Sequence, residues 1–284
     1  MTDLTTRPKT ILSMQSQVAG ARVGNSVAAF AMERLGVRVW QLPTTLLGRR
    51  PDLGPPGGGP LPAETLSSLF EGLAAEGRLG EVDAVLVGYL GDSEQVSVIL
   101  DAAQRVKTAN PKALFVVDPV LGDDGKMYVS AAIADAVLNG LAPHADWLAP
   151  NLFELGLIAG KDIESLEHAR DAARRIGRPT LVSSIRTATG LGNLLAAPGG
   201  DWFCETPRLP RAPKGSGDLL NALFVARRVR GEAPAVALEA ATGAVFDVIV
   251  RSLAAESDEL LLPGAQDVLA EPVTWPRAVQ MELA

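Results

Sequence analysis

The sequence predicts an α/β fold, in which one domain is built on a central, mainly parallel β-sheet with helices on both faces. Short apolar runs of strand length alternate with longer segments of helical periodicity along most of the chain. Runs of this kind are typical of parallel strands that are buried on both faces. The N-terminal order of strand, helix and strand is that of a parallel unit. Since no internal repeat divides the chain, we predict that residues 1–284 form a single domain.

The expected elements follow this alternation from end to end. The N-terminal unit has a strand at 10–16, a helix at 24–36 that ends on a glycine, and a strand at 37–42. Helices and buried strands then alternate in the middle of the chain, with helices at 63–77, 93–107 and near 130–139 and strands at 83–90 and 113–122. Asn151 is expected to open a further helix. The C-terminal part is expected to contain a helix at 166–177, a strand at 180–184, a hairpin at 192–207, and helices at about 216–230 and 234–255.

Residues 44–62 differ from the rest of the chain because glycine and proline dominate them. Such a composition disfavours regular structure, so we expect an irregular loop here. It is either a surface connection or a flap over the site, since long irregular loops in compact domains often act as lids.

Charge and composition limit the classes of function. The chain has 284 residues and a formal net charge of −7, which argues against nucleic acid or an anionic membrane as the main partner. The polar N-terminus lacks the apolar core of a signal peptide, and no apolar run reaches the ~18 residues of a membrane span. With a single cysteine, Cys204, no intramolecular disulfide can form. We expect a cytoplasmic protein.

Several common catalytic patterns are missing from the sequence. There is no G-x-x-x-x-G-K-[ST] phosphate loop, and no G-x-G-x-x-G follows a predicted strand. The two histidines, His144 and His168, are far apart, which gives little support for a zinc site or a Ser-His-Asp triad. Cys204 lies in the predicted hairpin without a basic neighbour, so we interpret it as a packing residue.

Polar residues gather instead where predicted strands end. Asp118 directly follows an apolar strand, and Asp123 comes five residues later in a glycine-flanked turn. They are either ordinary turn residues or part of a polar pocket near a cation. Asn151 and Glu154 lie three residues apart, which is the spacing of a helix capping box. The alternative is that Glu154 helps to hold Mg²⁺, because hard cations prefer oxygen ligands.

The stretch KGSGDLLNALF, residues 214–224, is the most informative in the chain. Gly215 and Gly217 allow a tight turn, so that several backbone N–H groups converge at the start of the helix near Ser216. Asp218 falls in the first helical turn, where the helix dipole alone favours an acid. Phosphoryl transfer, however, requires charge-stabilising donors and a base for the attacking hydroxyl. Gly-Ser-Gly-Asp can supply both, and we therefore predict an anion-binding helix terminus.

These blocks resemble those of the pyridoxal kinases, the vitamin B6 kinases of the ribokinase-like superfamily. ILSMQSQVAGARVGNSVAAFAMERLGVRVWQL is similar to the family's opening strand, serine turn and glycine-asparagine helix. VLVGYLGDSEQ, DPVLGDDGKMYV, APNLFEL and KGSGDLLNALF resemble its later motifs in the same order. The resemblance covers about residues 10–255. It implies one ribokinase-like domain, usually dimeric, that transfers the ATP γ-phosphate to the 5′-hydroxymethyl group of pyridoxal, and of pyridoxine or pyridoxamine, to give the 5′-phosphate in B6 salvage.

Position by position, the resemblance implies a role for each matching residue. Asp218 matches the catalytic base, and Gly215, Ser216 and Gly217 match the anion hole. The implied contacts with the vitamer are Ser16, Gln17, Pro51 and Tyr89. The implied contacts with ATP are Asp118, Tyr128, Asn151, Ser183 and Ser184, and the implied metal residues are Asp123 and Glu154. The resemblance also implies Mg²⁺, leaves open a monovalent cation, and implies a homodimer.

The chain departs from the family pattern mainly where the acceptor should bind. Gln17 replaces a histidine, and residues 45–54 read TLLGRRPDLG where the family is close to VQFSNHTQYG, which puts Pro51 in place of a pocket threonine. Ala149 replaces a threonine near the phosphates. Two alternatives to a B6 kinase therefore stay open, a kinase for another small alcohol such as a hydroxymethylpyrimidine, and a vitamer-binding homologue of low turnover. A nucleotide-dependent oxidoreductase lacks its glycine fingerprint.

Overall fold

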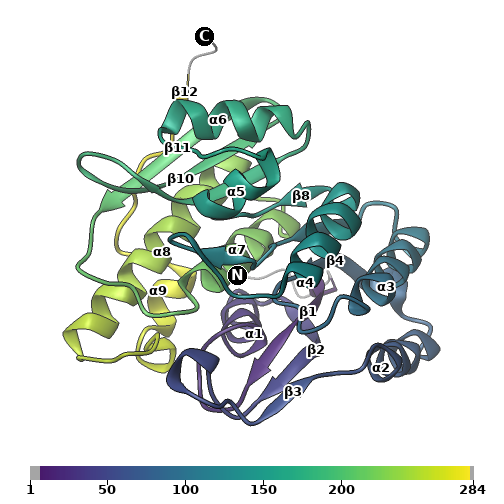
Figure 1. Ribbon diagram of the computed structural model, residues 1–284. Helices are drawn as coiled ribbons and strands as arrows, with labels where there is room; N and C mark the ends of the chain where they lie inside the picture. The colour runs from purple at the N-terminus through teal and green to yellow at the C-terminus, as the bar shows by residue number, and fades with distance from the viewer. Residues whose placement is uncertain (1–6, 282–284) are drawn as a thin grey trace.

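A ten-stranded sheet forms the centre of the computed structural model, which describes residues 7–281 (Figure 1). Its strand order is β12-β11-β10-β9-β8-β5-β4-β1-β2-β3. The strands span Thr10–Val18 (β1), Arg38–Leu47 (β2), Gly58–Pro60 (β3), Val82–Val87 (β4), Leu114–Val117 (β5), Trp147–Leu148 (β8), Thr180–Arg186 (β9), Gly190–Ala197 (β10), Gly200–Pro207 (β11) and Val279–Met281 (β12). A separate two-stranded ribbon contains β6 (Gly122–Asp123) and β7 (Lys126–Met127).

The sheet is parallel in its middle and antiparallel at its two edges. The pairs from β2 through β1, β4, β5 and β8 to β9 are all parallel. β3 joins one edge in antiparallel direction, and β10, β11 and β12 extend the other edge in the same way. The predicted α/β fold with a mainly parallel sheet is therefore confirmed, and so is the predicted hairpin near 192–207.

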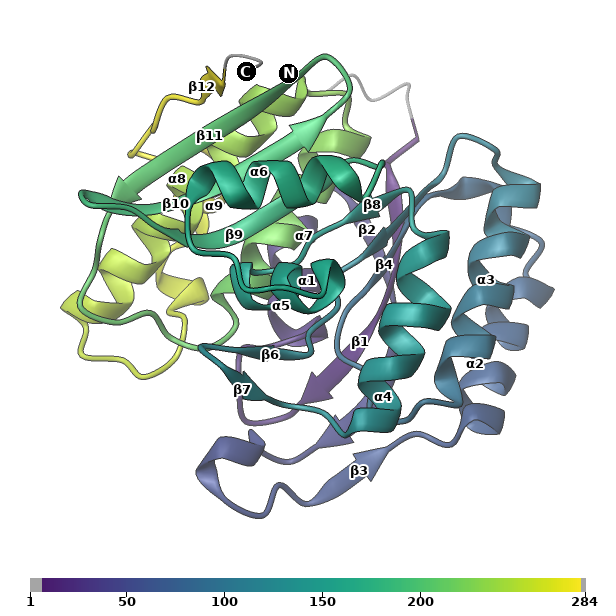
Figure 2. The ribbon, with the colours of Figure 1, turned by 45° about the horizontal axis from the view of Figure 1, so that its top comes forward.

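Helices cover both faces of the sheet (Figure 2). They span Asn25–Arg34 (α1), Ala63–Ala75 (α2), Gln95–Ala109 (α3), Ala131–Asp135 (α4, continued by a π-helical turn Ala136–Leu141), Leu152–Ala159 (α5), Leu166–Arg175 (α6), Ser216–Val229 (α7), Pro234–Ala254 (α8) and Gln266–Ala270 (α9). Neighbouring strand residues point to opposite faces, so that Ile11 packs with α1, α7, α8 and α9 and Leu12 packs with α2, α3 and α4. Helices α5 and α6 pack on Val182 and Leu194.

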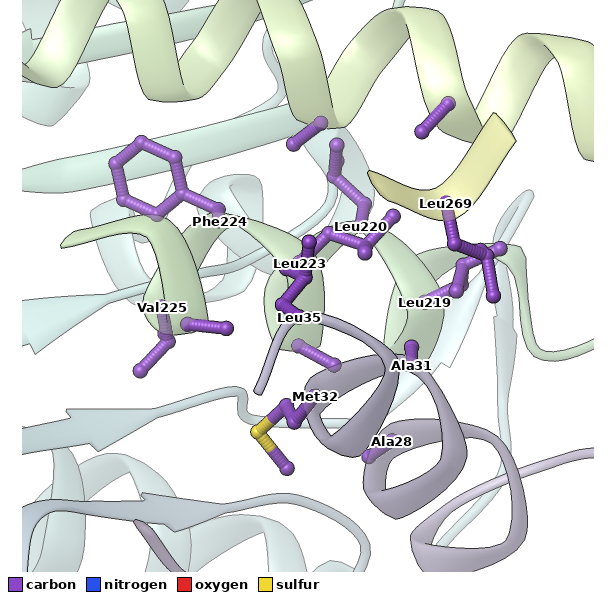
Figure 3. Close-up of a cluster of buried hydrophobic side chains, with 14 of the residues drawn as sticks. Ala28, Ala31, Met32, Leu35, Leu219, Leu220, Leu223, Phe224, Val225 and Leu269 are labelled. Carbon is purple, nitrogen blue, oxygen red and sulfur yellow. The ribbon is translucent and has the colours of Figure 1, made fainter. Parts of the chain in front are cut away.

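Helix α7 is the most deeply packed helix on its face of the sheet. Every residue from Leu219 to Arg227 is buried. Figure 3 shows Leu223 turned toward α1, where Ala28 and Ala31 are small enough for a close approach. A helix with apolar residues on all sides belongs in an interior position, and this burial fixes where its N-terminus lies.

The prediction that residues 44–62 form an irregular loop is wrong in part. β2 continues to Leu47, and β3 pairs with it in register from Thr45 with Pro60 to Leu47 with Gly58. A Cβ atom at Gly58 would lie 2.1 Å from the Leu46 carbonyl oxygen, so glycine here permits strand pairing where it was expected to prevent it. Only the tip of this hairpin, including the 3₁₀ turn Pro51–Leu53, is without strand structure.

Sequence patterns did not reveal the shortest elements. β8 has two residues and β12 has three, which is too few for a recognisable alternation. Cys204 is fully buried, as expected of a packing residue, and burial raises the pKa of its thiol to about 12. Over residues 7–281, none of the helices combines the length and hydrophobicity that crossing a membrane requires.

Replacing Leu223 with alanine removes a fully buried side chain from the contact between α7 and its neighbours. We expect the free energy of unfolding to fall by about 2–5 kcal/mol, because a buried leucine loses both its transfer free energy and the packing around the resulting cavity. Urea denaturation followed by circular dichroism measures this loss. Leu69→Ala on α2 is the matched control, since Leu69 is 41% exposed and its loss should stay below about 1 kcal/mol. Equal losses for the two variants would contradict the packing described.

Candidate active site

A large cavity of about 1450 Å³ lies at the carboxyl ends of the parallel strands. This is the edge at which open α/β sheets bind ligands. Fourteen of the fifteen residues selected from the sequence line the cavity, namely Ser16, Pro51, Tyr89, Asp118, Asp123, Tyr128, Asn151, Glu154, Ser183, Ser184, Gly215, Ser216, Gly217 and Asp218. They come from segments spread over two hundred residues of sequence, and the parallel strand order brings them together.

Gln17 is the exception, and the prediction that it lines this cavity is wrong. It neighbours Ser16 on β1, and successive side chains of a strand point to opposite faces. Ser16 faces the cavity, whereas Gln17 faces α1 and donates a hydrogen bond from Nε2 to Ser26 Oγ at 2.9 Å. Gln17 instead lines a separate, smaller hollow with Arg22, Glu33 and other polar residues.

The carboxylate of Asp218 lies at the N-terminus of α7, in its first turn. Gly215 is the N-cap residue, with φ of 92°, so the free N–H groups of the first turn border the cavity. Asp218 Oδ2 accepts a hydrogen bond of 2.8 Å from the backbone N–H of Gly24, in the turn before α1. Burial raises the pKa of Asp218 above its ordinary value, and the Gly24 hydrogen bond opposes that rise.

Gly24 can hold this position only because it has no side chain. Its φ is 55°, and a Cβ atom there would lie 2.3 Å from the Ser16 carbonyl oxygen. The turn before α1 therefore packs directly against the end of β1, and the Gly24 N–H is directed at Asp218. One backbone contact thus connects the cavity-facing end of β1 with the start of α7.

A second buried acid, Asp118, follows β5. It is 8% exposed, and its Oδ2 accepts a hydrogen bond of 2.6 Å from Nδ2 of Asn221. Asn221 is one helical turn after Asp218 and so lies on the same face of α7. Burial raises the pKa of Asp118 well above its ordinary value, and the carboxylates of Glu154 and Asp218 raise it further.

Glu154 is held mainly by backbone N–H groups. Asn151 caps α5, and the reciprocal capping box of Asn151 and Glu154 expected from the sequence is confirmed. Glu154 Oε1 also accepts hydrogen bonds from the N–H groups of Leu121 and Gly122, at 2.7 and 3.3 Å. Burial raises the Glu154 pKa to about 7; its backbone hydrogen bonds oppose that rise and the charge of Asp123 adds to it. The glutamate therefore ties the β6–β7 ribbon to the start of α5.

Lys214 connects two segments at the rim of the cavity. Its Nζ donates a hydrogen bond of 2.9 Å to the Tyr128 hydroxyl, beyond β7, and lies 5.1 Å from the centre of the Tyr128 ring. The contact with Tyr128 raises the pKa of Lys214, and the charges of Asp123 and Asp52 add to the rise. The lysine thus sits next to the N-terminus of α7 as a positive charge facing two acidic segments.

Ser183 and Ser184 border another part of the cavity, on β9. The Ser183 N–H donates to the Pro150 carbonyl at 3.0 Å, and Ser184 has φ of 65°. Val120, after Asp118, has φ of 44°, an outlying value for a β-branched residue. Backbone in such strained conformations gathers at functional sites.

The structure adds residues that the sequence patterns did not select. Gly24, Asn221 and Lys214 all lie within motifs that resemble the family's. Their roles were not recognised because their hydrogen-bond partners lie far away in sequence. One wall of the cavity is formed by Val245, Phe246 and Ile249 of α8. Nothing in the sequence of α8 distinguishes these residues from ordinary core positions. Neither histidine lines the cavity.

The acidic side chains do not form a metal cage on their own. Among residues 7–281, no three of His, Cys, Asp or Glu are placed to hold an ion together. The Glu154 carboxylate is already occupied by three backbone N–H groups. A hard cation here would take most of its ligands from phosphate oxygens and water, as Mg²⁺ does in many phosphoryl-transfer sites.

Comparison with known proteins gives one consistent result. The phosphomethylpyrimidine kinase family model matches residues 58–260. Pyridoxal kinase PdxY of Pseudomonas fluorescens (strain Pf-5) is 38% identical over 273 residues, covering 92% of this chain and 94% of the relative. PdxY of Burkholderia thailandensis is 36% identical over 277 residues, covering 94% and 96%. Among solved structures, the pyridoxal kinase of Leishmania donovani in complex with ADP and pyridoxamine has a TM-score of 0.91 and 25% identity, covering 96% of this chain and 100% of that chain.

Gly24→Ala should destabilise the protein and disturb Asp218. An alanine must adopt φ near 55° and also displace the Ser16 carbonyl, so we expect a loss of roughly 2–4 kcal/mol in the free energy of unfolding. Gly36→Ala is the control, because Gly36 has φ of 76° but no atom within 4 Å of the added Cβ. It should lose only about 1 kcal/mol. Urea titrations of both variants measure the difference, and similar losses would show that the close approach to β1 is unimportant.

Asp218→Asn should stabilise the protein at pH 8. The folded-state pKa of Asp218 is raised, so the ionised carboxylate destabilises the fold above that pKa, and the cost disappears once pH falls below the ordinary value near 4. The thermal midpoint of the variant should exceed that of the wild type at pH 8, by roughly 2–4 °C for each kcal/mol removed, and match it at pH 4. Differential scanning calorimetry measures both.

Asp267→Asn is the control of opposite sign. The guanidinium of Arg251 lowers the Asp267 pKa to about 2, so removal of this carboxylate should lower the thermal midpoint at pH 8. A stabilising effect from both substitutions would contradict the electrostatic explanation.

Proposed function

This chain belongs to the pyridoxal kinase family, and we propose that it uses Asp218 to transfer the ATP γ-phosphoryl group to the 5′-hydroxymethyl group of pyridoxal, and of related B6 vitamers. The observation that carries the assignment of Asp218 is its position: a partly buried carboxylate at the N-terminus of α7, facing the cavity and fixed by the Gly24 N–H. The similar kinase of Leishmania donovani was solved with ADP and pyridoxamine, ligands of the same chemical classes.

Asp218 acts as the general base. Its carboxylate accepts the proton of the vitamer hydroxyl as the oxygen attacks the γ-phosphorus and the bond to the β-phosphate oxygen breaks. Burial supports this role, because a raised pKa makes the carboxylate a stronger base. The hydrogen bond from Gly24 holds Oδ2, which leaves Oδ1 for the substrate hydroxyl.

The start of α7 stabilises the negative charge of the transferred group. The free N–H groups at residues 215–218 and the positive end of the helix dipole favour an anion there. Lys214 adds a full positive charge directly before the first turn. These groups belong to a helix that is packed on all sides, so little reorganisation is needed during the reaction.

The two substrates occupy different parts of the cavity. The acceptor lies against Ser16, Tyr89 and the tip of the β2–β3 hairpin, on the β1 side of Asp218. ATP extends along Asn151, Ser183 and Ser184 toward the apolar wall of α8, where Phe246 and Val245 suit an aromatic base. Tyr128 and Lys214 lie over the phosphates.

Mg²⁺ bound to the nucleotide would neutralise phosphate charge. Asp118 and Asp123 are the carboxylates that fit this ion, because each lines the cavity with oxygen atoms not fully used by backbone N–H groups. Glu154, whose carboxylate accepts three backbone hydrogen bonds, would act on the ion through bound water. A monovalent cation and a homodimer stay predictions from the family resemblance. A cytoplasmic location, a single domain over 1–284 and a flap at residues 44–62 stay predictions from the composition and pattern of the sequence.

A hydroxymethylpyrimidine is the second candidate acceptor, since the matching family model is described as a phosphomethylpyrimidine kinase. A panel of pyridoxal, pyridoxine, pyridoxamine and hydroxymethylpyrimidine, assayed for ADP formation with and without Mg²⁺, compares the two. We expect the highest kcat/KM with a B6 vitamer. Tight vitamer binding with no ADP formation from any acceptor would instead identify a binding protein of low turnover.

Asp218→Asn should lower kcat by about 10²–10⁴-fold, because the amide cannot take the hydroxyl proton. The KM for ATP should change little, since Asp218 faces the acceptor. In the wild type, kcat/KM should fall toward acid pH with a midpoint above that of an ordinary aspartate, because a protonated base is inactive. Asp101→Asn on α3, outside the cavity, serves as the control. Full activity of the Asp218→Asn variant would rule out the proposed base.

A further inference from the structure

Arg50 is a mostly buried cation at the acceptor end of the cavity. It precedes the 3₁₀ turn at the tip of the β2–β3 hairpin, at the edge of the molecule in Figure 2, and its side chain is only 12% exposed. Its Nε and Nη2 each donate a hydrogen bond of 3.0 Å to the carboxylate of Asp52. Within the described residues, Nη1 takes part in no hydrogen bond. One edge of the guanidinium is therefore fixed and the other can donate to a ligand.

The neighbouring arginine, Arg49, has a different environment from Arg50. Arg49 does not line the cavity; its Nε donates at 2.9 Å to the Pro55 carbonyl, within the outer part of the same hairpin tip. The two arginines have the same charge and adjacent positions but point to different environments. This makes Arg49 a natural control for any effect of Arg50.

The acceptor wall around Arg50 offers few other donors. Val18 and Leu47 are apolar, and Pro51 has neither a backbone N–H nor a side-chain hydroxyl. Ser16 and Tyr89 provide single hydroxyl groups. Asp52 balances the charge of Arg50 only weakly, because its side chain is 49% exposed and the charge of Lys214 also acts on it. The wall is thus suited to an acceptor that carries one anionic oxygen.

We propose that Arg50 determines acceptor specificity by donating from Nη1 to the anionic ring oxygen of a 3-hydroxypyridine. This inference rests on the proposed function. At neutral pH the ring of a B6 vitamer is dipolar, with a protonated nitrogen and a deprotonated 3-oxygen. A guanidinium binds such an oxygen with a charge-assisted hydrogen bond. A hydroxymethylpyrimidine has no ring oxyanion, so the same arginine favours the vitamer over the pyrimidine.

The test compares two variants on two acceptors. Arg50→Gln removes the charge, and 3-deoxypyridoxal, with hydrogen in place of the 3-hydroxyl, removes its partner. We expect Arg50→Gln to lower kcat/KM for pyridoxal by roughly 10–100-fold, the range for a hydrogen bond between charged groups. For 3-deoxypyridoxal, the same substitution should change kcat/KM by less than about 3-fold. The difference between the two acceptors isolates the pair, as in a double-mutant cycle. Arg49→Gln should change neither value.

The other possible outcomes contradict either the proposed function or the role of Arg50. If the wild type fails to phosphorylate pyridoxal, the proposed function itself is wrong. If it does so and Arg50→Gln lowers kcat/KM equally for both acceptors, Arg50 only holds the hairpin tip in place through Asp52, and the inference fails. The inference also fails if Arg50→Gln has no effect on pyridoxal, or if the wild type prefers 3-deoxypyridoxal.

Discussion

The hydrogen bond between the Gly24 N–H and Asp218 is the contact on which the site depends. It joins residues 194 positions apart and fixes the carboxylate at the point where the end of β1 meets the start of α7. Both sides of the contact need special backbone. Gly24 must touch the Ser16 carbonyl, and Gly215 must turn the chain with a left-handed φ beneath the Arg22 carbonyl. Burial of α7 then prevents the helix from moving away. The proposed base is therefore positioned by a backbone N–H group at a turn whose geometry requires glycine.

The same arrangement concentrates negative charge in the interior. Asp118, Glu154 and Asp218 all have raised pKa values, chiefly because burial disfavours their charged forms, and Asp118 also because its neighbours are acids. An empty site of this kind opposes folding at neutral pH, and the apolar packing of α7 against α1 and α8 offsets that cost. In the proposed function, this concentration of negative charge favours a nucleotide bound with its metal ion over the bare nucleotide. The free-energy cost of the buried acids in the cavity is thus offset by the apolar packing beneath them.

Much of this could be predicted from the sequence, and the failures have physical reasons. Strand ends could be located because parallel buried strands are continuous apolar runs, and this alone placed Asp118 and Asn151 at the cavity. Gln17 was misplaced because side chains alternate along a strand, so that the adjacent residues Ser16 and Gln17 face different sides of the sheet. The β2–β3 pairing was missed because Gly58 permits a close strand contact that composition alone suggests is broken. Asn221 was missed because its partner, Asp118, is 103 residues away and only the folded chain brings them together.

The catalytic and acceptor ends of the cavity are built on elements that differ in how deeply they are buried. Asp218 and its anion-binding turn belong to a helix buried on every side, where a substitution disturbs the core. The acceptor wall includes a hairpin tip at the sheet edge, where Leu46 and Leu53 are half exposed and Arg49 lies outside the cavity. Residues there can change with little effect on folding, because loop tips carry few buried contacts. The longest departure from the family pattern, residues 45–54, falls on this hairpin, whereas Gln17 and Ala149 are single replacements elsewhere. Under the proposed roles of Arg50 and Pro51, the accepted alcohol can change without disturbing Asp218, since neither residue belongs to the apolar cluster that packs α7.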